Sequence, residues 1–441
     1  MLPRRRFLQL LPAAALAQPA PRPRNVIVIV TDDQGIGDLG CYGDPDARTP
    51  HLDGLAARGI RFTQWYSNAP ICSASRAALL TGKYPDRTGV KGALQSSPAF
   101  NIPGLRDGEL TFPKWFQKRG YRTALLGKWH LGSVSHSRPR AQGFDEFFGW
   151  YSGWLDAYSH RYYQMNGSFI FHDLWRDDQE VFEEPAYMTE LLGREAAGFL
   201  SRQSARQPFY LQLCFGAPHY SMMAPRKYLE RFPAAMDRDR REHLAMVGAV
   251  DDVVGSLLRQ LKTQGLEDST IIAFLSDNGA TREVRASSSG KPYAGGSNGR
   301  RRGYKQGLFD GGINVPAILR APGQQPRTWE RPVLTMDLLP TLLALADPAA
   351  APPAGIDGHN FLGAQPEHER MFWSFEKSRA VRAGDWKLIL NPPDFPGEEV
   401  RTDLWLSNLE SDPGERTNFA ASEPERVRRM TEWIREWERS L

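Results

Sequence analysis

Four short apolar runs, each followed within four residues by charged, amide or imidazole side chains, constrain the fold of this 441-residue chain more than any other feature. The first run, NVIVIVT at residues 25–31, is continuous and β-branched, as expected of a strand buried on both faces of a parallel sheet. In open α/β sheets, ligands bind outside the carboxyl ends of the strands. The sequence therefore predicts an α/β fold with one shared site. The runs cover residues 25–31, 121–126, 209–215 and 270–275, and after them come Asp32 and Asp33, Lys128 and His130, His219, and Asp277 and Asn278.

The remaining patterns divide the chain into a large α/β part and a smaller C-terminal part. We predict helices at residues 49–59, 72–82, 111–120, 187–206, 237–264 and 333–345, and another strand at 314–319. Short strands at 370–376, 378–382, 386–390 and 402–409 then precede a helix at 423–440. The expected architecture is an α/β domain over residues 25–365, with a large mixed, mostly parallel sheet sandwiched by helices. A C-terminal α+β subdomain is expected over residues 366–441, with a small antiparallel sheet and a terminal helix.

Two segments lack a clear period. Residues 143–175 are rich in aromatic side chains and are predicted to form long loops and short elements. We favour ordinary packing for them; alternatively, Trp154 and Tyr158 form a lip that stacks on a sugar or aryl ring. Residues 282–302 are rich in Ser, Gly and Arg and are predicted to be a long mobile loop. Its run of arginines at 300–302 is either a solvated surface or a device that steers an anionic substrate.

The N-terminus is typical of a targeting segment. Three arginines at residues 4–6 precede Phe7 and Leu8, an apolar stretch and a cleavage-like Ala-Leu-Ala. This order resembles a twin-arginine export signal, with an ordinary secretory signal as the alternative. We therefore expect residues 1–24 to be an export signal and spacer, and the mature protein to be periplasmic or secreted. No later apolar run is long enough to span a bilayer.

Composition excludes several classes of protein. The formal net charge is +4, too small for a dedicated nucleic-acid binder of this length.

Only 11 of the 55 basic residues are lysines, so a lysine set among glycines stands out, as Lys128 and Lys305 do. The three cysteines form neither a disulfide framework nor a zinc motif. For Cys41 and Cys214 we favour buried, inert thiols.

Cys72 occupies a different setting, at the start of the helical stretch CSASRAALLTG. A helix N-terminus presents unpaired N–H groups and partial positive charge, which favours an anion beside Cys72. The alternative is a small helix with a buried cysteine.

The side chains after the strands indicate a cation site next to an anion site. Asp32, Asp33, Asp277 and Asn278 offer hard oxygen donors, which suit Ca²⁺ or Mg²⁺ rather than zinc or copper. Positive or protonatable groups surround them: Arg76, Lys128, His130, His219 and Lys305. This combination predicts a pocket for an oxyanion such as sulfate or phosphate, with acid–base groups at hand.

These motifs, in this order, resemble those of the sulfatase family in the alkaline phosphatase-like superfamily. The family signature Cys-x-(Pro or Ala)-Ser-Arg is matched by residues 72–76, with Thr-Gly at 81–82. The ordered set continues with GDLGCYG at 37–43, GKWHLG at 127–132, Pro218-His219 and SDNG at 276–279. It ends with Lys305 and the pair Gly311-Gly312. Asp310 stands where the family usually has Glu.

The resemblance implies an exported hydrolase of sulfate esters of a carbohydrate or aryl alcohol. It implies that a formylglycine-generating enzyme converts Cys72 to formylglycine, whose hydrate is a geminal diol. One hydroxyl would attack sulfur to give a covalent sulfate ester, and the other would expel sulfate. By position, the ligands of Ca²⁺, preferred over Mg²⁺, would be Asp32, Asp33, Cys72, Asp277 and Asn278. Arg76 would hold the diol, His130 would be the base, Lys128 and Lys305 would bind sulfate, and His219 with Lys305 would protonate the leaving alcohol.

Two alternatives remain at this point. The superfamily shares its metal site with phosphoryl and phosphonate ester hydrolases, so the substrate could be a phosphorus ester. If Cys72 stays unmodified, the chain could instead bind sulfated glycans without turnover, although pure binding does not need His130 and His219.

Overall fold

The computed structural model describes residues 23–164, 169–348, 351–364, 367–395 and 398–441. The predicted export signal therefore lies almost wholly outside the described residues, and so does the predicted domain boundary at 365–366.

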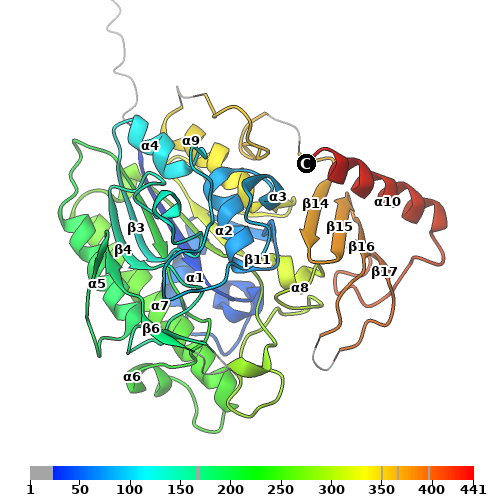
Figure 1. Ribbon diagram of the computed structural model, residues 1–441, viewed down its shortest axis with the longest axis horizontal. Helices are drawn as coiled ribbons and strands as arrows, with labels where there is room; N and C mark the ends of the chain where they lie inside the picture. Colours follow the sequence, from blue (N-terminus) through cyan, green and yellow to red (C-terminus); the bar gives the residue numbers. More distant parts are fainter. Residues whose placement is uncertain (1–22, 165–168, 349–350, 365–366, 396–397) are drawn as a thin grey trace, which may run out of the picture.

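A large mixed sheet forms the centre of the molecule (Figure 1). Its middle strands β10, β1, β9, β3 and β4 are parallel, and β11 runs antiparallel between β10 and β2. The fold class predicted from the sequence is thus confirmed. The strands, in sheet order, are β12 (Arg327–Trp329), β2 (Ile60–Tyr66), β11 (Asn314–Arg320), β10 (Thr270–Ser276), β1 (Asn25–Thr31), β9 (Phe209–Cys214), β3 (Arg122–Lys128), β4 (Glu146–Trp150), β7 (Trp175–Arg176) and β8 (Gln179–Glu180), with β13 (Val333–Leu334) paired to β2.

Both faces of this sheet are covered by helices because the central strand is apolar on both sides. Ile27 and Ile29 of β1 belong to a core with α1, α5 and α7, whereas Val26, Val28 and Val30 belong to a core with α2, α4 and α9. Successive side chains of a strand point to opposite faces, so one continuous apolar run supplies both cores. The helices are α1 (Pro50–Ala57), α2 (Cys72–Thr81), α3 (Pro85–Thr88), α4 (Phe112–Lys118), α5 (Met188–Ser201), α6 (Arg226–Leu229), α7 (Arg238–Thr263), α8 (Asp310–Ile313) and α9 (Leu338–Ala346).

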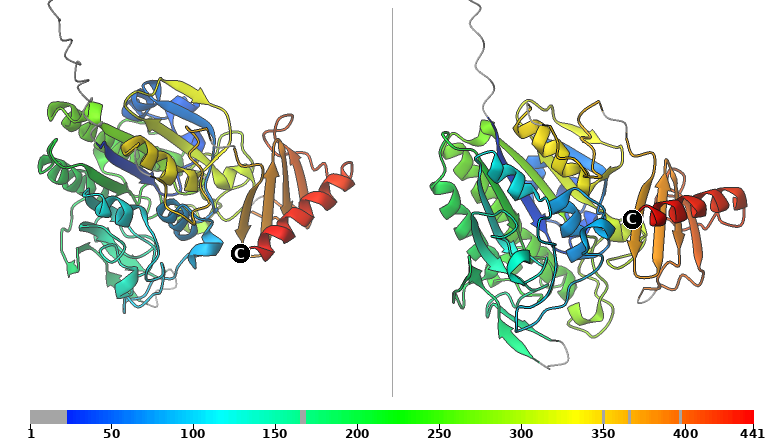
Figure 2. Two further views of the ribbon diagram at one scale, coloured as in Figure 1. Left: turned by 90° about the horizontal axis from the view of Figure 1, so that it is seen from above. Right: turned by 45° about the horizontal axis from the view of Figure 1, so that its top comes forward.

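The C-terminal part is a separate antiparallel sheet beside the main body (Figures 1 and 2). It consists of β14 (Met371–Phe375), β15 (Ser378–Ala383), β16 (Trp386–Leu390) and β17 (Leu404–Asn408), and α10 (Pro424–Arg439) packs on one face through Met430 and Ile434. Each of these elements was predicted from the sequence, with ends that differ by at most two residues.

A buried ion cluster joins the two sheets. Lys387 of β16 has no exposed surface, and its Nζ lies 2.5 Å from Oδ1 of Asp310 in α8 and 2.8 Å from Oε1 of Glu415. Tyr66 of β2 donates to the other oxygen of Asp310 at 2.7 Å. Burial raises the pKa of Glu415 to about 7 although Lys387 opposes this, whereas Lys387 and Arg382 lower the pKa of Asp310 to about 2 against its burial, so the cations of the cluster stabilise mainly the Asp310 charge.

We therefore expect Lys387→Met to lower the free energy of unfolding by about 3–5 kcal/mol, because it removes the ammonium that pairs with both buried carboxylates. Urea unfolding at pH 8 measures this loss. Lys377→Met, on an exposed turn of the same sheet, is the control and should change stability by less than about 0.5 kcal/mol. Equal stability of the two variants would show that the cluster is not a significant link.

The structure adds detail to the predicted elements, or corrects them, at four places. Residues 60–66 form β2, which was not predicted; residues 146–150, inside the aromatic segment, form the parallel strand β4. The helix predicted from residue 333 begins at Leu338, after β13 and a 3₁₀ turn. The loop at 282–302 is packed against α7, since Ser287 donates to Asp239 at 2.7 Å and Tyr293 is fully buried.

Candidate active site

The carboxyl ends of β1 and β10 bring the acidic residues together. Thr31 pairs with Ser276, so the residues that follow each strand are neighbours. The Asp33 backbone N–H donates to Oδ1 of Asp277 at 3.2 Å, and the Asn278 amide donates to Oδ1 of Asp33 at 2.7 Å. The predicted convergence of Asp32, Asp33, Asp277 and Asn278 is therefore present in the structure.

Helix α2 places Cys72 and Arg76 beside these acids. Cys72 is the first residue of the helix and is only 3% exposed, and Gly82 ends the helix in a left-handed conformation. Arg76, one turn further on, pairs through Nη2 with Oδ2 of Asp277 at 2.7 Å and donates from Nη1 to the Lys128 carbonyl at 3.2 Å. The spacing of four residues thus puts the guanidinium and the thiol on the same side of α2.

Two lysines complete a ring of paired charges. Lys128 Nζ lies 2.6 Å from Oδ2 of Asp32, and Lys305 Nζ lies 2.8 Å from Oδ2 of Asp33. Together with the Arg76–Asp277 pair, three buried carboxylates face three buried cations. Because the fixed charges balance, a divalent cation bound here would leave a net positive pocket for an anion.

The acids retain free ligand capacity. Among the described residues, Oδ1 of Asp32 and Oδ1 of Asn278 are buried and have no hydrogen-bond partner. Burial raises the pKa of Asp33 to about 7, against the effect of Lys305 and with the help of Asp32 and Asp277. A hard cation would reduce the repulsion between these crowded carboxylates and would bind their unpaired oxygens. The oxygen donor set therefore fits Ca²⁺.

The two predicted acid–base histidines are buried with defined outer hydrogen bonds. His130 Nε2 lies 3.0 Å from the Leu94 carbonyl, which can only accept, so Nδ1 carries the lone pair. His219 Nδ1 donates likewise to the Tyr220 carbonyl at 2.9 Å, and its Nε2 lies 3.6 Å from Oδ2 of Asp33. Burial, reinforced by the nearby lysines, holds the pKa of both histidines well below the ordinary value, so both rings are neutral.

Cys72 is poorly suited to act as a thiolate. Burial raises the pKa of its thiol, although Lys128 and Lys305 oppose the shift. A raised thiol pKa reduces the fraction of the nucleophilic form. The pocket therefore favours a different nucleophile at position 72.

An open cavity leads to Cys72, and the two lysines differ in their access to it. Lys305 lines the cavity together with His130 and His219, whereas Lys128 has no exposed surface and pairs with Asp32. Sequence reasoning did not single out several other lining residues: Gln95, Tyr162, Tyr220, Arg285 and Gln306. Arg285 lies in the packed Ser- and Arg-rich loop, with its guanidinium carbon 4.9 Å from the centre of the Tyr220 ring.

The aromatic segment contributes one of the two side chains proposed as a lip. Trp154 lines the cavity and packs edge-on against Tyr163 at 4.2 Å between ring centres. Tyr158 instead packs against Tyr187 at 5.3 Å. The arginine run also lies elsewhere: Arg301 donates to the Thr63 carbonyl at 2.8 Å, and Arg302 stacks on Trp405 at 4.1 Å.

The other two cysteines sit as expected of inert thiols. Cys214 is buried in β9, and burial together with Asp53 raises the pKa of the half-buried Cys41 to about 12.

The fold and this site define a hydrolase of the alkaline phosphatase-like class. The sequence profile of the sulfatase family matches residues 24–348, and the chain belongs to that family of sulfuric ester hydrolases. It is 31% identical to N-acetylgalactosamine-6-sulfatase of Homo sapiens over 96% of this chain and 87% of that protein. The enzyme of the same name from Canis lupus familiaris is 33% identical over 99% of this chain and 90% of that protein.

Solved structures agree with this assignment. The structure described as "Ps i-CgsB in complex with k-i-k-neocarrahexaose" superposes with a TM-score of 0.82, at 29% identity, over 94% of this chain and 93% of that one. The phosphonate monoester hydrolase of Agrobacterium radiobacter shares the fold alone, with a TM-score of 0.64 and 21% identity over 95% and 96% of the two chains.

Proposed function

We propose that the protein hydrolyses sulfate esters of a sulfated carbohydrate, with formylglycine at position 72 and Ca²⁺ at the acidic cluster. One observation carries the proposal: Cys72 starts a helix beside a charge-balanced ring of buried ion pairs whose carboxylate and amide oxygens are partly unpaired. A carbohydrate substrate is favoured because two of the similar proteins have names that refer to sugars. These are the N-acetylgalactosamine-6-sulfatases and the protein solved in complex with neocarrahexaose.

The absent groups would supply the nucleophile and the Lewis acid. A calcium ion held by Asp32, Asp33, Asp277, Asn278 and residue 72 would withdraw charge from sulfate oxygens, and formylglycine would provide a geminal diol. Arg76, fixed by Asp277 and the Lys128 carbonyl, orients residue 72. Removing one such preorganised contact typically costs about a hundredfold or more in rate.

The chain's own groups then divide the proton transfers. His130 accepts the proton of a hydroxyl at residue 72, because its unpartnered Nδ1 carries the lone pair. Lys305 is the proton reservoir on the leaving-group side: although burial disfavours its charge, Asp33 and Glu283 raise its pKa well above the ordinary value. Nε2 of His219 and Nζ of Lys305 lie 3.6 and 2.8 Å from the same oxygen, Oδ2 of Asp33, so a proton of Lys305 can reach the leaving oxygen directly or after transfer to Nε2 of His219. Lys305 also binds the sulfate from the cavity wall. Lys128, which is buried and paired with Asp32, adds positive charge to the sulfate site.

Export and maturation belong to the same proposal. Residues 1–24 would direct the protein to the periplasm or the exterior by the twin-arginine or a general secretory route. A formylglycine-generating enzyme would act on residues 72–76. Within the described residues, no helix is long and apolar enough to cross a membrane.

We expect the purified protein to release sulfate from an aryl sulfate and to act far more slowly on the matching aryl phosphate. Chelation by EDTA should remove at least about nine-tenths of the activity, because the acids then lack their counter-ion, and Ca²⁺ should restore it better than Mg²⁺. A panel of sulfated glycans, assayed by released sulfate, identifies the carbohydrate. Preference for the phosphate would establish the phosphorus-ester alternative, and binding of sulfated glycans without turnover by a protein that retains the Cys72 thiol would establish the non-catalytic one.

A further inference from the structure

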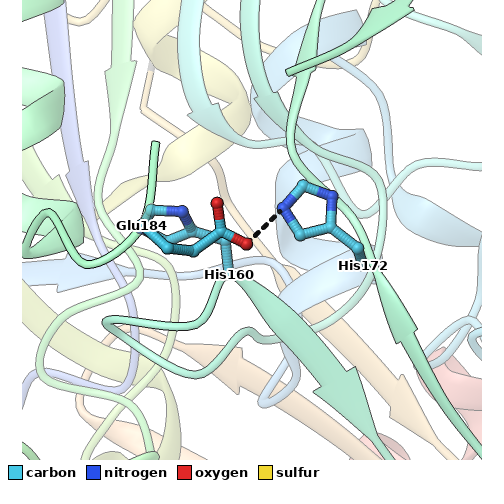
Figure 3. Close-up of side chains that lie close together, drawn as sticks. All are labelled: His160, His172 and Glu184. Carbon is cyan, nitrogen blue, oxygen red and sulfur yellow. Dashed lines mark ion pairs between the residues drawn. The ribbon is translucent and has the colours of Figure 1, made fainter. Parts of the chain in front are cut away.

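A second group of metal-ligand side chains, two from the aromatic segment and one from the stretch after it, lies outside the active site (Figure 3). His160 precedes the short strand β5 (Arg161–Tyr163), His172 ends its partner β6 (Ile170–His172), and Glu184 lies in the segment before α5. One nitrogen of each histidine and one carboxylate oxygen of Glu184 lie within 4.8 Å of one another.

Outer hydrogen bonds fix which nitrogen of each ring faces the group. His160 Nε2 lies 2.9 Å from the Ala186 carbonyl, which can only accept, so Nε2 carries the hydrogen and Nδ1 the lone pair. His172 Nδ1 lies 2.8 Å from Oε1 of Glu180, which accepts its hydrogen, so in the neutral ring Nε2 carries the lone pair. A histidine that donates one N–H to a carbonyl or carboxylate and points the other nitrogen at an ion is the usual arrangement in metal sites.

Three acceptors therefore face one another with no hydrogen between them. His172 Nε2 lies 3.3 Å from Oε1 of Glu184, the pair joined by the dashed line in Figure 3. Among the described residues, His160 Nδ1 and His172 Nε2 are buried and have no hydrogen-bond partner, and His160 is fully buried. A proton on His172 would satisfy Glu184 but would leave His160 Nδ1 unpaired, whereas a metal ion would satisfy all three.

We propose that His160 Nδ1, His172 Nε2 and the Glu184 carboxylate bind a divalent transition-metal ion of the Zn²⁺ class, with water as the fourth ligand. Two imidazoles and one carboxylate are a common zinc ligand set. The 3.3 Å between His172 and Glu184 matches the separation of about 3.3 Å between two ligands of a tetrahedral zinc with bonds of about 2.0–2.1 Å. The Glu184 side chain is 26% exposed, so the ion can enter from solvent.

The site is distinct from the proposed Ca²⁺ site in chemistry and in its effect. Nitrogen ligands select Zn²⁺ over Ca²⁺, and oxygen ligands do the reverse. A bound ion would tie the β5–β6 hairpin to the segment before α5. This hairpin carries Tyr162, which lines the active-site cavity and packs on Trp154 at 5.1 Å.

The test is binding of Zn²⁺, and of Co²⁺ as a coloured probe, to the full-length protein in excess Ca²⁺. We expect one tight equivalent of Zn²⁺ by equilibrium dialysis, visible absorption from bound Co²⁺ and a rise in the midpoint of thermal unfolding with added Zn²⁺. Glu184→Gln and His172→Gln should each remove that equivalent. Glu180→Gln, which alters only the outer hydrogen bond of His172, should weaken binding about 10–100-fold.

Glu183→Gln is the matched control. Glu183 is the sequence neighbour of Glu184 but pairs with Arg194 at 2.6 Å, so this variant should bind Zn²⁺ as the wild type does. The proposal is overturned if the wild type takes up no more Zn²⁺ than Glu184→Gln, or if His172→Gln takes up as much Zn²⁺ as the wild type. The circular dichroism spectrum of Glu184→Gln should match that of the wild type, which shows that its loss of Zn²⁺ uptake is not a loss of folding.

Discussion

Replacement of Cys72 by alanine should reduce sulfate release to the background rate, a loss of at least about a thousandfold, while the protein still folds. The side chain is buried at the start of α2 and makes no described hydrogen bond that alanine would break, so the structural cost is confined to a small cavity. Catalysis, by contrast, would lose its nucleophile. The rate on an aryl sulfate and the urea unfolding curve measure the two effects separately.

Mass spectrometry decides whether this loss reflects formylglycine. Trypsin should release residues 62–76 as one peptide containing position 72. We expect the wild-type peptide to have the mass of the aldehyde and Cys72→Ser to be inactive. Cys41→Ala, which alters a thiol outside the cavity, should keep the wild-type rate. Active enzyme with an intact Cys72 thiol would refute the proposed nucleophile.

The sequence predicted the centre of the fold because burial on both faces leaves a clear pattern. The run at 25–31 had to be a central strand, and the four polar strand ends had to meet once the strands lay parallel. The convergence of Asp33, Asp277 and Lys128 follows from that topology, whereas Lys305 comes from a loop. The resemblance to sulfatases added roles that the residue types alone left open, such as the distinction between His130 and His219.

The sequence analysis missed elements whose residue pattern does not distinguish a strand or a metal site from other structures. β2, IRFTQWY, carries polar residues on a partly exposed strand near the sheet edge, and β4 is hidden in a run of aromatic residues. Trp154 and Tyr158 could not be distinguished from the sequence, since both are aromatic and only tertiary packing sends one to the cavity and the other to Tyr187. The His160–His172–Glu184 group was missed because its spacing fits no short metal motif.

The ring of ion pairs also shows why the site is sensitive to single changes. Each carboxylate pairs with a cation and is also a proposed metal ligand, so one substitution alters the charge balance and the ion site together. Asp277 is the extreme case, because it accepts from Arg76 and from the Asp33 backbone.

Asp277→Asn should therefore abolish activity and also destabilise the fold. The amide would weaken Ca²⁺ binding and leave the buried Arg76 guanidinium without its counter-charge. Loss of one partner from a buried ion pair costs about 3–5 kcal/mol. Burial and Asp32 raise the pKa of Asp277 despite Arg76, so part of its charge is already unfavourable and we expect the lower end, about 3 kcal/mol.

A double-mutant cycle separates the two effects of this change. Arg76→Met with Asp277→Asn should be more stable than Asp277→Asn alone, because no unpaired guanidinium remains, yet it should be equally inactive. Asp251→Asn is the control: that buried carboxylate accepts from the backbone of His51 and Leu52, away from the site, and its loss should not change the rate per folded molecule. If the double variant were no more stable than Asp277→Asn, the Arg76–Asp277 pair would not be the source of the destabilisation. If Asp277→Asn kept normal turnover and normal Ca²⁺ dependence, Asp277 would not be a ligand of the ion.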